Sequence, residues 1–325
     1  MPQRLECSTP RLPPCRHDNA RTYPGRVTTI SEAVTYVKGH GTQNDFVVLT
    51  DPAVELDLTT DFVAAVCDRR RGIGADGMLR VARAVALVRA GVLDGLPEGV
   101  EPDDWFMDYR NADGSIAEMC GNGVRVFAHY LRATGLVEVD EFTVGSRAGA
   151  RPVHVHSYDD LHADVSVRMG PVTIGDDATV RIGDDLYPGV AVDVGNPHLA
   201  CVMPDLSATD LAAVDFSAGV VLPDGVFPHG ANVEVLTAPD TGTHGLHATM
   251  RVFERGVGET RSCGTGLVAA AAAALRTLEL ESGEMVIDVR GGRVTVTVDA
   301  GEATLRGPSA LVADGTFRAG WYRVD

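Results

Sequence analysis

Lysine is almost missing from this chain of 325 residues, in which Lys38 is the only one and arginine supplies the remaining positive charge. A cofactor held as a Schiff base needs a lysine, so the composition argues against pyridoxal-phosphate chemistry. Long apolar runs are also missing. The most apolar segment, residues 266–275, is far shorter than the ~20 residues that span a bilayer. The first residues contain no hydrophobic run either, so we expect no membrane partner and a cytoplasmic location.

The sequence also has few basic residues relative to acidic ones, and its cysteines are not arranged in pairs. The formal charge is −17, and a phosphate backbone is bound through basic surface, so a nucleic-acid partner is not expected. The six cysteines are scattered, with no CxxC pair and no histidine at zinc-ligand spacing. This pattern predicts neither a disulfide framework nor a metal site. By default each cysteine is a small buried hydrophobe.

The chain divides into three parts by composition. Residues 1–33 are rich in Pro, Arg and Thr and show no periodicity, so we expect a flexible N-terminal extension. Alternating apolar segments joined by glycine-containing turns follow, which is typical of antiparallel strands. We predict a first lobe of residues 34–158 with the tail 312–325, and a second lobe of residues 159–311.

An internal repeat is the most informative feature of the sequence. MDYRNADGSIAEMCGNGVRVFAHYL starts at Met107, and MRVFERGVGETRSCGTGLVAAAAAAL starts at Met250. A constant offset of 143 residues, the difference between 250 and 107, also aligns Cys120 with Cys263. Each copy reads as a strand, a polar loop, Cys-Gly-x-Gly and a helix. The repeat therefore predicts two similar lobes related by a pseudo-twofold axis, with the two Cys-Gly-x-Gly turns facing each other.

The two helices that follow these turns define the expected fold class. The second helix, from Gly266 onward, is apolar on all faces, and a helix without a polar face is normally buried. The first ends at Gly135, a suitable C-terminal cap. We expect an α+β fold of two pseudo-symmetric lobes, each a mainly antiparallel sheet or barrel wrapped around a central helix.

Cys120 and Cys263 are the candidate catalytic residues. The N-terminus of a helix carries free N–H groups and a positive dipole end, so we expect lowered pKa values for both thiols, ~3.5–7.5 in known cases. Inversion at a carbon requires a proton to leave one face and another to arrive on the opposite face. Two facing thiols, one of them a thiolate, can do both by general acid–base catalysis. The same N–H groups can stabilise charge on a substrate carboxylate.

The motifs that surround these cysteines resemble those of the diaminopimelate epimerase family over nearly all of residues 36–325. They occur in one order: GHGTQNDFVVL, RRRGIGADG, RNADGSIAEMCGNGVR, VGNPHLA, FPHGANVEVL and FERGVGETRSCGTG. The resemblance implies the epimerase fold, interconversion of LL- and meso-diaminopimelate, no cofactor, and a homodimer. One departure is Gly77, where many members of the family have glutamine, which puts one hydrogen bond to the substrate in doubt.

The resemblance also implies roles for individual residues. Cys120 and Cys263 are the proton-transfer pair, and His198 and Glu254 resemble residues that tune them. The residues implied in substrate binding are Asn44, Asn111, Gly121, Asn122, Asn196, Asn232, Glu254, Arg255, Gly264 and Thr265.

The distal end of such a substrate suits these residue types. Glu254 can pair with an ammonium group, and Arg255 can hold a carboxylate bidentately. Each residue also has a structural alternative. Glu254 and Arg255 could form a surface ion pair, and His198 could be a core histidine. Asparagines such as Asn44 often have a structural role in turns.

Three other functions remain open at this point. A proline or hydroxyproline racemase would share the cysteine pair but handle a substrate with no distal charged group. A redox protein would use the two cysteines as a regulatory disulfide. A non-catalytic amino-acid-binding protein would have no obvious need for two activated thiols.

Overall fold

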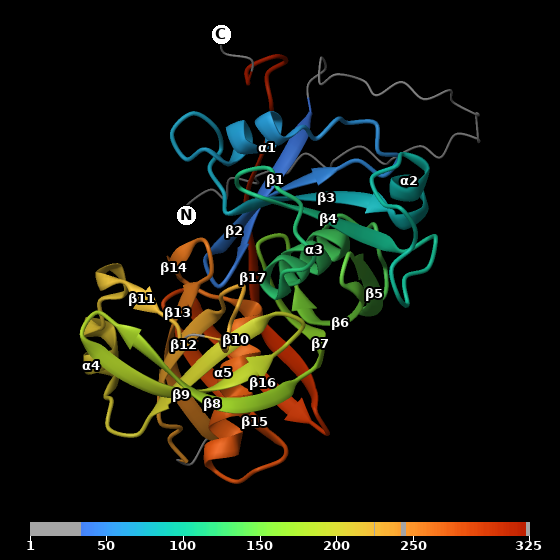
Figure 1. The fold of residues 1–325 in the computed structure, drawn as a ribbon. Helices are drawn as coiled ribbons and strands as arrows, with labels where there is room; N and C mark the ends of the chain where they lie inside the picture. The colour runs from blue at the N-terminus through green and yellow to red at the C-terminus, as the bar shows by residue number, and fades with distance from the viewer. Residues whose placement is uncertain (1–33, 224, 242–244, 323–325) are drawn as a thin grey trace, which may run out of the picture.

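The computed structural model describes residues 34–223, 225–241 and 245–322, which form two strand-rich lobes (Figure 1). The predicted N-terminal extension, residues 1–33, lies outside these ranges. The first half contains β1 (Thr35–Gly41), β2 (Asn44–Thr50), α1 (Thr60–Cys67), β3 (Gly77–Arg83), α2 (Ala84–Arg89), β4 (Trp105–Asn111), α3 (Gly121–Ala133), β5 (Glu141–Ser146), β6 (Gly149–Tyr158) and β7 (His162–Pro171).

The second half follows a similar order with small differences. It contains β8 (Thr173–Ile182), β9 (Asp185–Asp193), β10 (Pro197–Met203), α4 (Ala208–Ala213), the 3-10 helix η1 (Phe216–Ala218), β11 (Val220–Val221), β12 (Asn232–Thr237), β13 (Leu246–Glu254), β14 (Gly258–Thr260), α5 (Gly264–Thr277), β15 (Gly283–Val289), β16 (Gly292–Asp299) and β17 (Glu302–Thr316). Among the described residues, no helix has the length and apolar character needed to cross a membrane.

Strand pairing confirms the duplication. From β1 to β7, successive neighbours pair antiparallel, parallel, antiparallel, parallel, antiparallel and antiparallel. The series β9, β10, β12, β13, β15, β16 and β17 follows the same order. The central helices begin at Gly121 and Gly264, which are 143 residues apart, as the repeat predicted.

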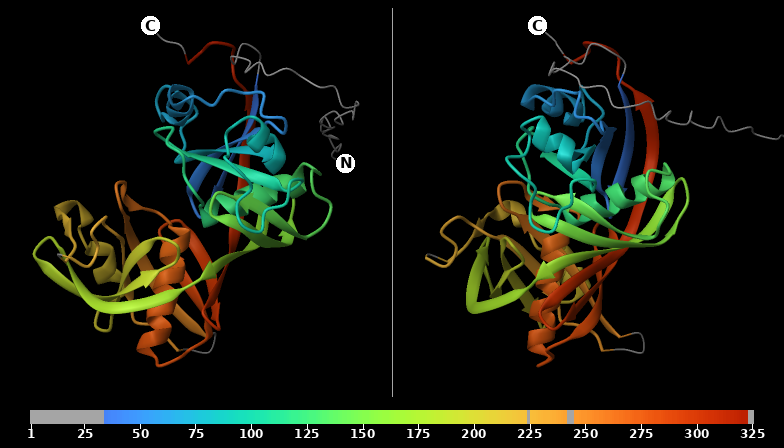
Figure 2. Two further views of the ribbon diagram at one scale, coloured as in Figure 1. Left: turned by 45° about the vertical axis from the view of Figure 1, so that its right-hand side comes forward. Right: turned by 90° about the vertical axis from the view of Figure 1, so that its right-hand side faces the viewer.

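Two strands pass from one lobe into the other. β17, red in Figure 2, pairs with β16 through residues 302–306 and with β1 through residues 310–316. In the opposite direction, β7 pairs with β6, and the chain then continues into β8, which pairs with β9. β7 and β17 also pair with each other. β17 from the second half thus pairs with the first strand of the first lobe, and β8, which continues from β7 of the first half, pairs with β9 of the second lobe. The predicted boundaries at 158/159 and 311/312 stay a proposal.

The two central helices are buried as predicted. Every residue of α3 from Gly121 to Leu131 is buried, and α5 is buried from Gly266 to Leu275. Burial of the alanine run on all faces follows from its lack of a polar face. α3 ends one residue before Thr134, and Gly135 takes a positive φ of 72°, the left-handed conformation expected of a glycine cap.

Candidate active site

The two cysteines stand at the starts of the central helices, where the helices meet. Cys120 and Cys263 are the N-terminal cap residues of α3 and α5, and both have extended backbone. A Cβ atom added to Gly264 would lie 3.1 Å from the Cα atom of Gly121 and 3.4 Å from the backbone nitrogen of Asn122. The helix starts are therefore in direct contact, and a side chain at Gly264 would push them apart.

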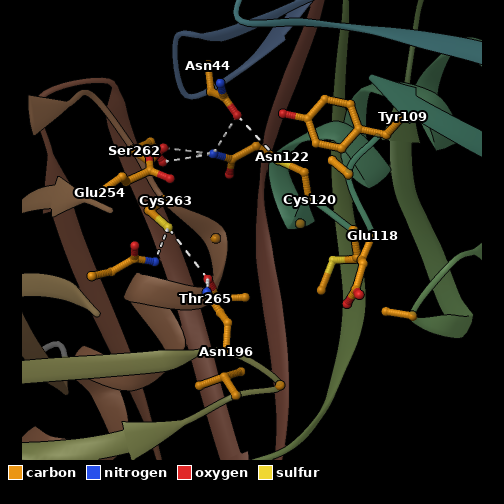
Figure 3. Close-up of a pocket in the computed structure, with 18 of the residues that line it drawn as sticks. Asn44, Tyr109, Glu118, Cys120, Asn122, Asn196, Glu254, Ser262, Cys263 and Thr265 are labelled. Atoms are coloured by element: carbon orange, nitrogen blue, oxygen red, sulfur yellow. Dashed lines mark hydrogen bonds between the residues drawn. The ribbon is translucent and has the colours of Figure 1, made fainter. Parts of the chain in front are cut away.

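A cavity of about 270 Å³ lies at this junction and is lined by both lobes (Figure 3). Cys120 and Cys263 face it from opposite sides. The predicted residues that line it are Asn44, Asn111, Cys120, Gly121, Asn122, Asn196, Asn232, Glu254, Cys263, Gly264 and Thr265. One cavity thus brings together eleven residues from separate sequence motifs.

The surroundings of Cys120 are mainly amides. Its Sγ lies 3.5 Å from Oδ1 of Asn44, which also accepts a hydrogen bond of 3.3 Å from Asn122. The Asn122 amide donates further to the backbone carbonyl of Ser262, at 3.2 Å, in the other lobe. Burial raises the pKa of Cys120 to about 11, although the N–H groups of Gly123 and Asn122 oppose this shift.

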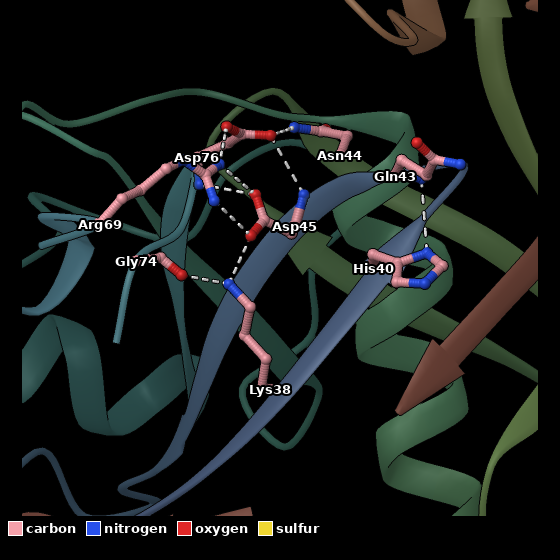
Figure 4. A network of polar contacts seen from close by, with 8 residues as sticks. All are labelled: Lys38, His40, Gln43, Asn44, Asp45, Arg69, Gly74 and Asp76. Carbon is pink, nitrogen blue, oxygen red and sulfur yellow. Dashed lines mark hydrogen bonds and ion pairs between the residues drawn. The ribbon is translucent and has the colours of Figure 1, made fainter. Parts of the chain in front are cut away.

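An ion-pair network fixes the orientation of Asn44 (Figure 4). The Asn44 amide nitrogen donates to Asp76 at 2.8 Å, so its oxygen must point toward the cavity. Arg69 bridges Asp76 and Asp45, with both shortest N–O distances at 2.7 Å. Lys38 completes the network by pairing with Asp45 and donating to the carbonyl of Gly74.

The surroundings of Cys263 are more acidic. Its Sγ lies 3.6 Å from the Thr265 hydroxyl and 4.0 Å from the Asn232 amide nitrogen. Burial raises its pKa well above the ordinary 9.0, and Glu254 and Glu234 raise it further. The predicted lowering of both thiol pKa values is therefore wrong for this structure, because burial outweighs the helix N–H groups.

Glu254 lines the cavity and accepts a 2.5 Å hydrogen bond from the Thr260 hydroxyl. Arg255 follows it but does not line the cavity. The Arg255 guanidinium donates to the carbonyl of His229 at 2.9 Å, and its backbone N–H donates to the Asn232 side chain at 2.9 Å. The two are thus not an ion pair, and in this structure Arg255 positions Asn232 through its backbone.

His198 is fully buried and lies behind the cavity lining. Its Nδ1 lies 2.8 Å from the carboxylate of Glu234, and its Nε2 lies 3.1 Å from the side-chain oxygen of Asn196. Asn196 in turn donates to Thr265 at 3.4 Å. His198 therefore hydrogen-bonds one cavity residue, Asn196, and among the described residues it forms no hydrogen bond with a cysteine. A tuning role for it would act through Asn196 or Glu234.

Comparison with known proteins identifies the family. The model of the family "Diaminopimelate epimerase" matches residues 36–175 and 190–312. The diaminopimelate epimerase of Rhodococcus jostii (strain RHA1) is 61% identical over 287 residues, covering 88% of this chain and 98% of that protein. The diaminopimelate epimerase of Mycobacterium leprae (strain Br4923) is 56% identical over 291 residues, or 88% and 97% of the two chains.

This chain belongs to the diaminopimelate epimerase family. Solved structures share the fold of this epimerase at low identity. A PhzF-family phenazine biosynthesis protein of Bacillus anthracis has a TM-score of 0.62 at 17% identity, covering 88% of this chain and 99% of that one. A hydroxyproline epimerase of Agrobacterium vitis has a TM-score of 0.55 at 13% identity, covering 87% and 92%. The predicted two-lobed α+β fold is confirmed.

The sequence interpretation missed several residues that line the cavity of this epimerase. Tyr109, Glu118 and Ser262 are among them, as is Arg151 on β6. The first three lie within the repeated segments, so the repeat itself was a usable signal. Arg151 lies outside every quoted motif, and no feature of the sequence points to it.

Gly77, the departure from the pattern of the epimerase family, lies against Tyr109. A Cβ atom at position 77 would come within 2.5 Å of the Tyr109 ring and 2.6 Å of the carbonyl of Arg110. Gly77 therefore makes room for the tyrosine, whose hydroxyl points toward Asn44 and Asn122 (Figure 3). Burial raises the pKa of Tyr109 well above 10, which keeps this hydroxyl a neutral donor.

Proposed function

We propose that Cys120 and Cys263 carry out the reaction of this amino-acid epimerase, the interconversion of LL- and meso-diaminopimelate for lysine and peptidoglycan precursors. The observation that carries the proposal is the placement of one cysteine from each lobe on opposite sides of a single cavity. Between them the two thiols supply both proton transfers, so the proposed chemistry calls for no cofactor.

In the proposed reaction, the thiolate of one cysteine removes the α-proton from one face of the carbon. The thiol of the other delivers its proton to the opposite face, and the roles exchange in the reverse direction. The turns Gly121–Asn122 and Gly264–Thr265 hold the reacting carboxylate. Free N–H groups at both helix starts stabilise the negative charge that develops there.

The distal amino-acid group lies, in this proposal, between Glu254 and the cavity asparagines. Glu254 pairs with the distal ammonium, and Asn111, Asn196 and Asn232 supply donors or acceptors. Arg255 takes the distal carboxylate by exchanging its hydrogen bond to the carbonyl of His229 for one to the substrate. A distal centre of the wrong configuration would leave buried polar groups unpaired, which selects against it.

The decisive experiment is incubation of the reduced protein with LL-diaminopimelate in D2O, followed by NMR. We expect loss of the α-proton signal and appearance of the meso isomer. Cys120→Ala and Cys263→Ala should each reduce epimerisation by about 10²–10⁴-fold. Cys201→Ala is the matched control, because Cys201 is a buried core thiol outside the cavity lining.

Two results would count against this function. Full activity in either cysteine variant would remove the two-thiol mechanism. No exchange with diaminopimelate in the wild-type protein would remove the substrate, and exchange with proline or hydroxyproline would then identify a racemase on the same scaffold.

We also propose that the epimerase works as a homodimer in the cytoplasm without nucleic-acid or membrane partners. The family resemblance supports the dimer, and the net charge of −17 supports the absence of anionic partners. Sedimentation equilibrium tests the dimer, and cell fractionation tests the location.

A further inference from the structure

A buried arginine distinguishes two otherwise similar helices. Arg125 lies in the second turn of α3 and has no exposed surface. The offset of 143 residues places Val268 at the same position of α5. Within the described ranges, Arg125 forms no ion pair with a carboxylate, and its Nε and Nη1 have no hydrogen-bond partner. An isolated buried charge is costly, so this cation needs a source of negative charge nearby.

The surroundings of Arg125 place its charge beside the active-site turn. Its Nη2 donates to the side-chain oxygen of Asn122, at 2.9 Å, and to the hydroxyl of Thr42, at 3.0 Å. Glycines leave room for the guanidinium on two sides. A Cβ atom at Gly41 would lie 3.0 Å from Nη2, and one at Gly307 would lie 2.8 Å from Nη1. The guanidinium is thus enclosed next to Asn122, two residues after Cys120.

The other cysteine has carboxylates where Cys120 has this cation. Glu234 is fully buried, and one of its oxygens has no hydrogen-bond partner. Its other oxygen would lie 2.5 Å from a Cβ atom at Gly266, in the first turn of α5. Glu254 acts on Cys263 from β13, so the second thiol has two acidic neighbours.

The charged and titratable groups around each thiol are therefore unequal. Arg125 on α3, Tyr109 on β4 and Glu254 on β13 act on Cys120. Glu254 on β13 and Glu234 on β12 act on Cys263, and His198 on β10 lies 2.8 Å from the Glu234 carboxylate. The permanently charged cation among these groups, Arg125, is on the Cys120 side, and the one carboxylate that acts on it, among the described residues, is Asp164 on β7.

We propose that Arg125 makes the two cysteines unequal before substrate arrives, favouring the thiolate at Cys120 while Glu234 and Glu254 keep Cys263 as the thiol. Arg125 is then a positioning residue that acts through Cys120 and Asn122. This inference rests on the proposed function for the role of the two thiols as a base and an acid. In the first turnover Cys120 takes the α-proton and Cys263 gives its proton, and proton exchange with solvent restores the initial state.

The test is alkylation by iodoacetamide over a range of pH, with the rate at each cysteine measured from its own peptide by mass spectrometry. The pH midpoint, unlike the absolute rate, does not depend on how accessible each thiol is. In the wild-type protein we expect a lower midpoint for Cys120 than for Cys263. Arg125→Met should raise the pH midpoint for alkylation of Cys120 by about one unit. At a pH below the midpoint, alkylation of Cys120 should then be about tenfold slower than in the wild-type protein. Arg125→Lys should largely restore the midpoint, because it keeps the charge.

Val268→Ala is the matched control, since it changes volume at the equivalent position of α5 without changing charge, and should leave both midpoints in place. An unchanged Cys120 midpoint in folded Arg125→Met, or a lower wild-type midpoint for Cys263, would overturn the proposal. If Arg125→Met does not fold, Glu234→Gln decides: a lower Cys263 midpoint supports the proposal, and an unchanged one overturns it. The assay uses no substrate, so absence of epimerisation in D2O would remove the proposed function without altering this result.

Discussion

Asp108 and Arg251 occupy equivalent positions of the two lobes, 143 residues apart on β4 and β13, and carry opposite charges. Asp108 is fully buried and pairs with three arginines, Arg80, Arg110 and Arg147, at 2.6–3.5 Å. The neighbours of Asp108 are therefore cations, which balance its negative carboxylate.

Arg251 has the reverse environment. It pairs with Glu259 at 2.6 Å and donates to the backbone carbonyls of Leu211, Ala212 and Val214. The comparison teaches that the duplicated backbone constrains where a buried charge sits, while its sign depends on the neighbours each lobe has acquired. The same division separates Arg125 from Val268, and Asn111 from Glu254.

The largest effect is expected when the negative charge of Asp108 is removed. Asp108→Asn leaves the three arginines without their shared anion, and we expect a loss of about 3–5 kcal/mol in the free energy of unfolding. Burial raises the pKa of Asp108, but Arg110, Arg147 and Arg80 outweigh burial and lower it below 3.8. The stabilisation is therefore present above pH 3.8 and is lost as the pH falls through the lower, folded-state value. Urea unfolding across this range measures both effects.

The exposed Asp184→Asn serves as the control for this variant and should change stability little. Equal stability of Asp108→Asn and wild type at neutral pH would show that the cluster contributes no net stability.

The next largest effect tests the difference in charge between Glu254 and Asn111, which occupy equivalent positions. Glu254→Gln removes the charge that pairs with the distal ammonium, and we expect kcat/KM to fall about 10–100-fold. Burial raises the pKa of Glu254 above 4.5, against hydrogen bonds from Thr260 and Cys263. Activity that needs the carboxylate should therefore decline as the pH falls through this raised value. The pH profile of kcat/KM should lose that acid limb in Glu254→Gln but keep it in Asn111→Ala.

The smallest effect concerns the contact between the helix starts. Gly264→Ala places a methyl group 3.1 Å from the Cα atom of Gly121, and we expect a loss of about 1–3 kcal/mol in stability. Gly123→Ala is the matched change on α3, where the new Cβ atom would meet only ordinary contacts at 3.5 Å. Thermal unfolding should show a lower midpoint for the first variant and an unchanged or higher one for the second. Identical midpoints would mean that the helix starts are not in close contact.

The sequence predicted what depends on local pattern and repetition. The alternating strands, the buried alanine helix and the facing Cys-Gly-x-Gly turns all follow from periodicity, glycine placement and the constant offset. Eleven of the predicted site residues line the cavity because they lie near the ends of elements that the repeat brings together.

The features that the sequence did not reveal depend on contacts between residues that are far apart in the chain. The thiol pKa values rise rather than fall because burial at the lobe junction depends on packing of both halves. The sequence shows Arg125 only as one residue of a helix, whereas the structure buries it between β1 and β17, where it forms no ion pair with any described residue. Arg255 and His198 are offset from the cavity by their own hydrogen bonds, which no sequence pattern encodes.

The exchange of β7 and β17 between the lobes has a consequence for how such a chain could originate. A polypeptide containing only one half would end with its last strand projecting beyond its own barrel, and its first strand would present an unpaired edge. Two copies could satisfy each other by trading those strands, which would create a symmetric pair with one cysteine from each. Fusion into a single chain then makes the partner permanently available at a fixed effective concentration. It also frees the two cysteine environments to diverge.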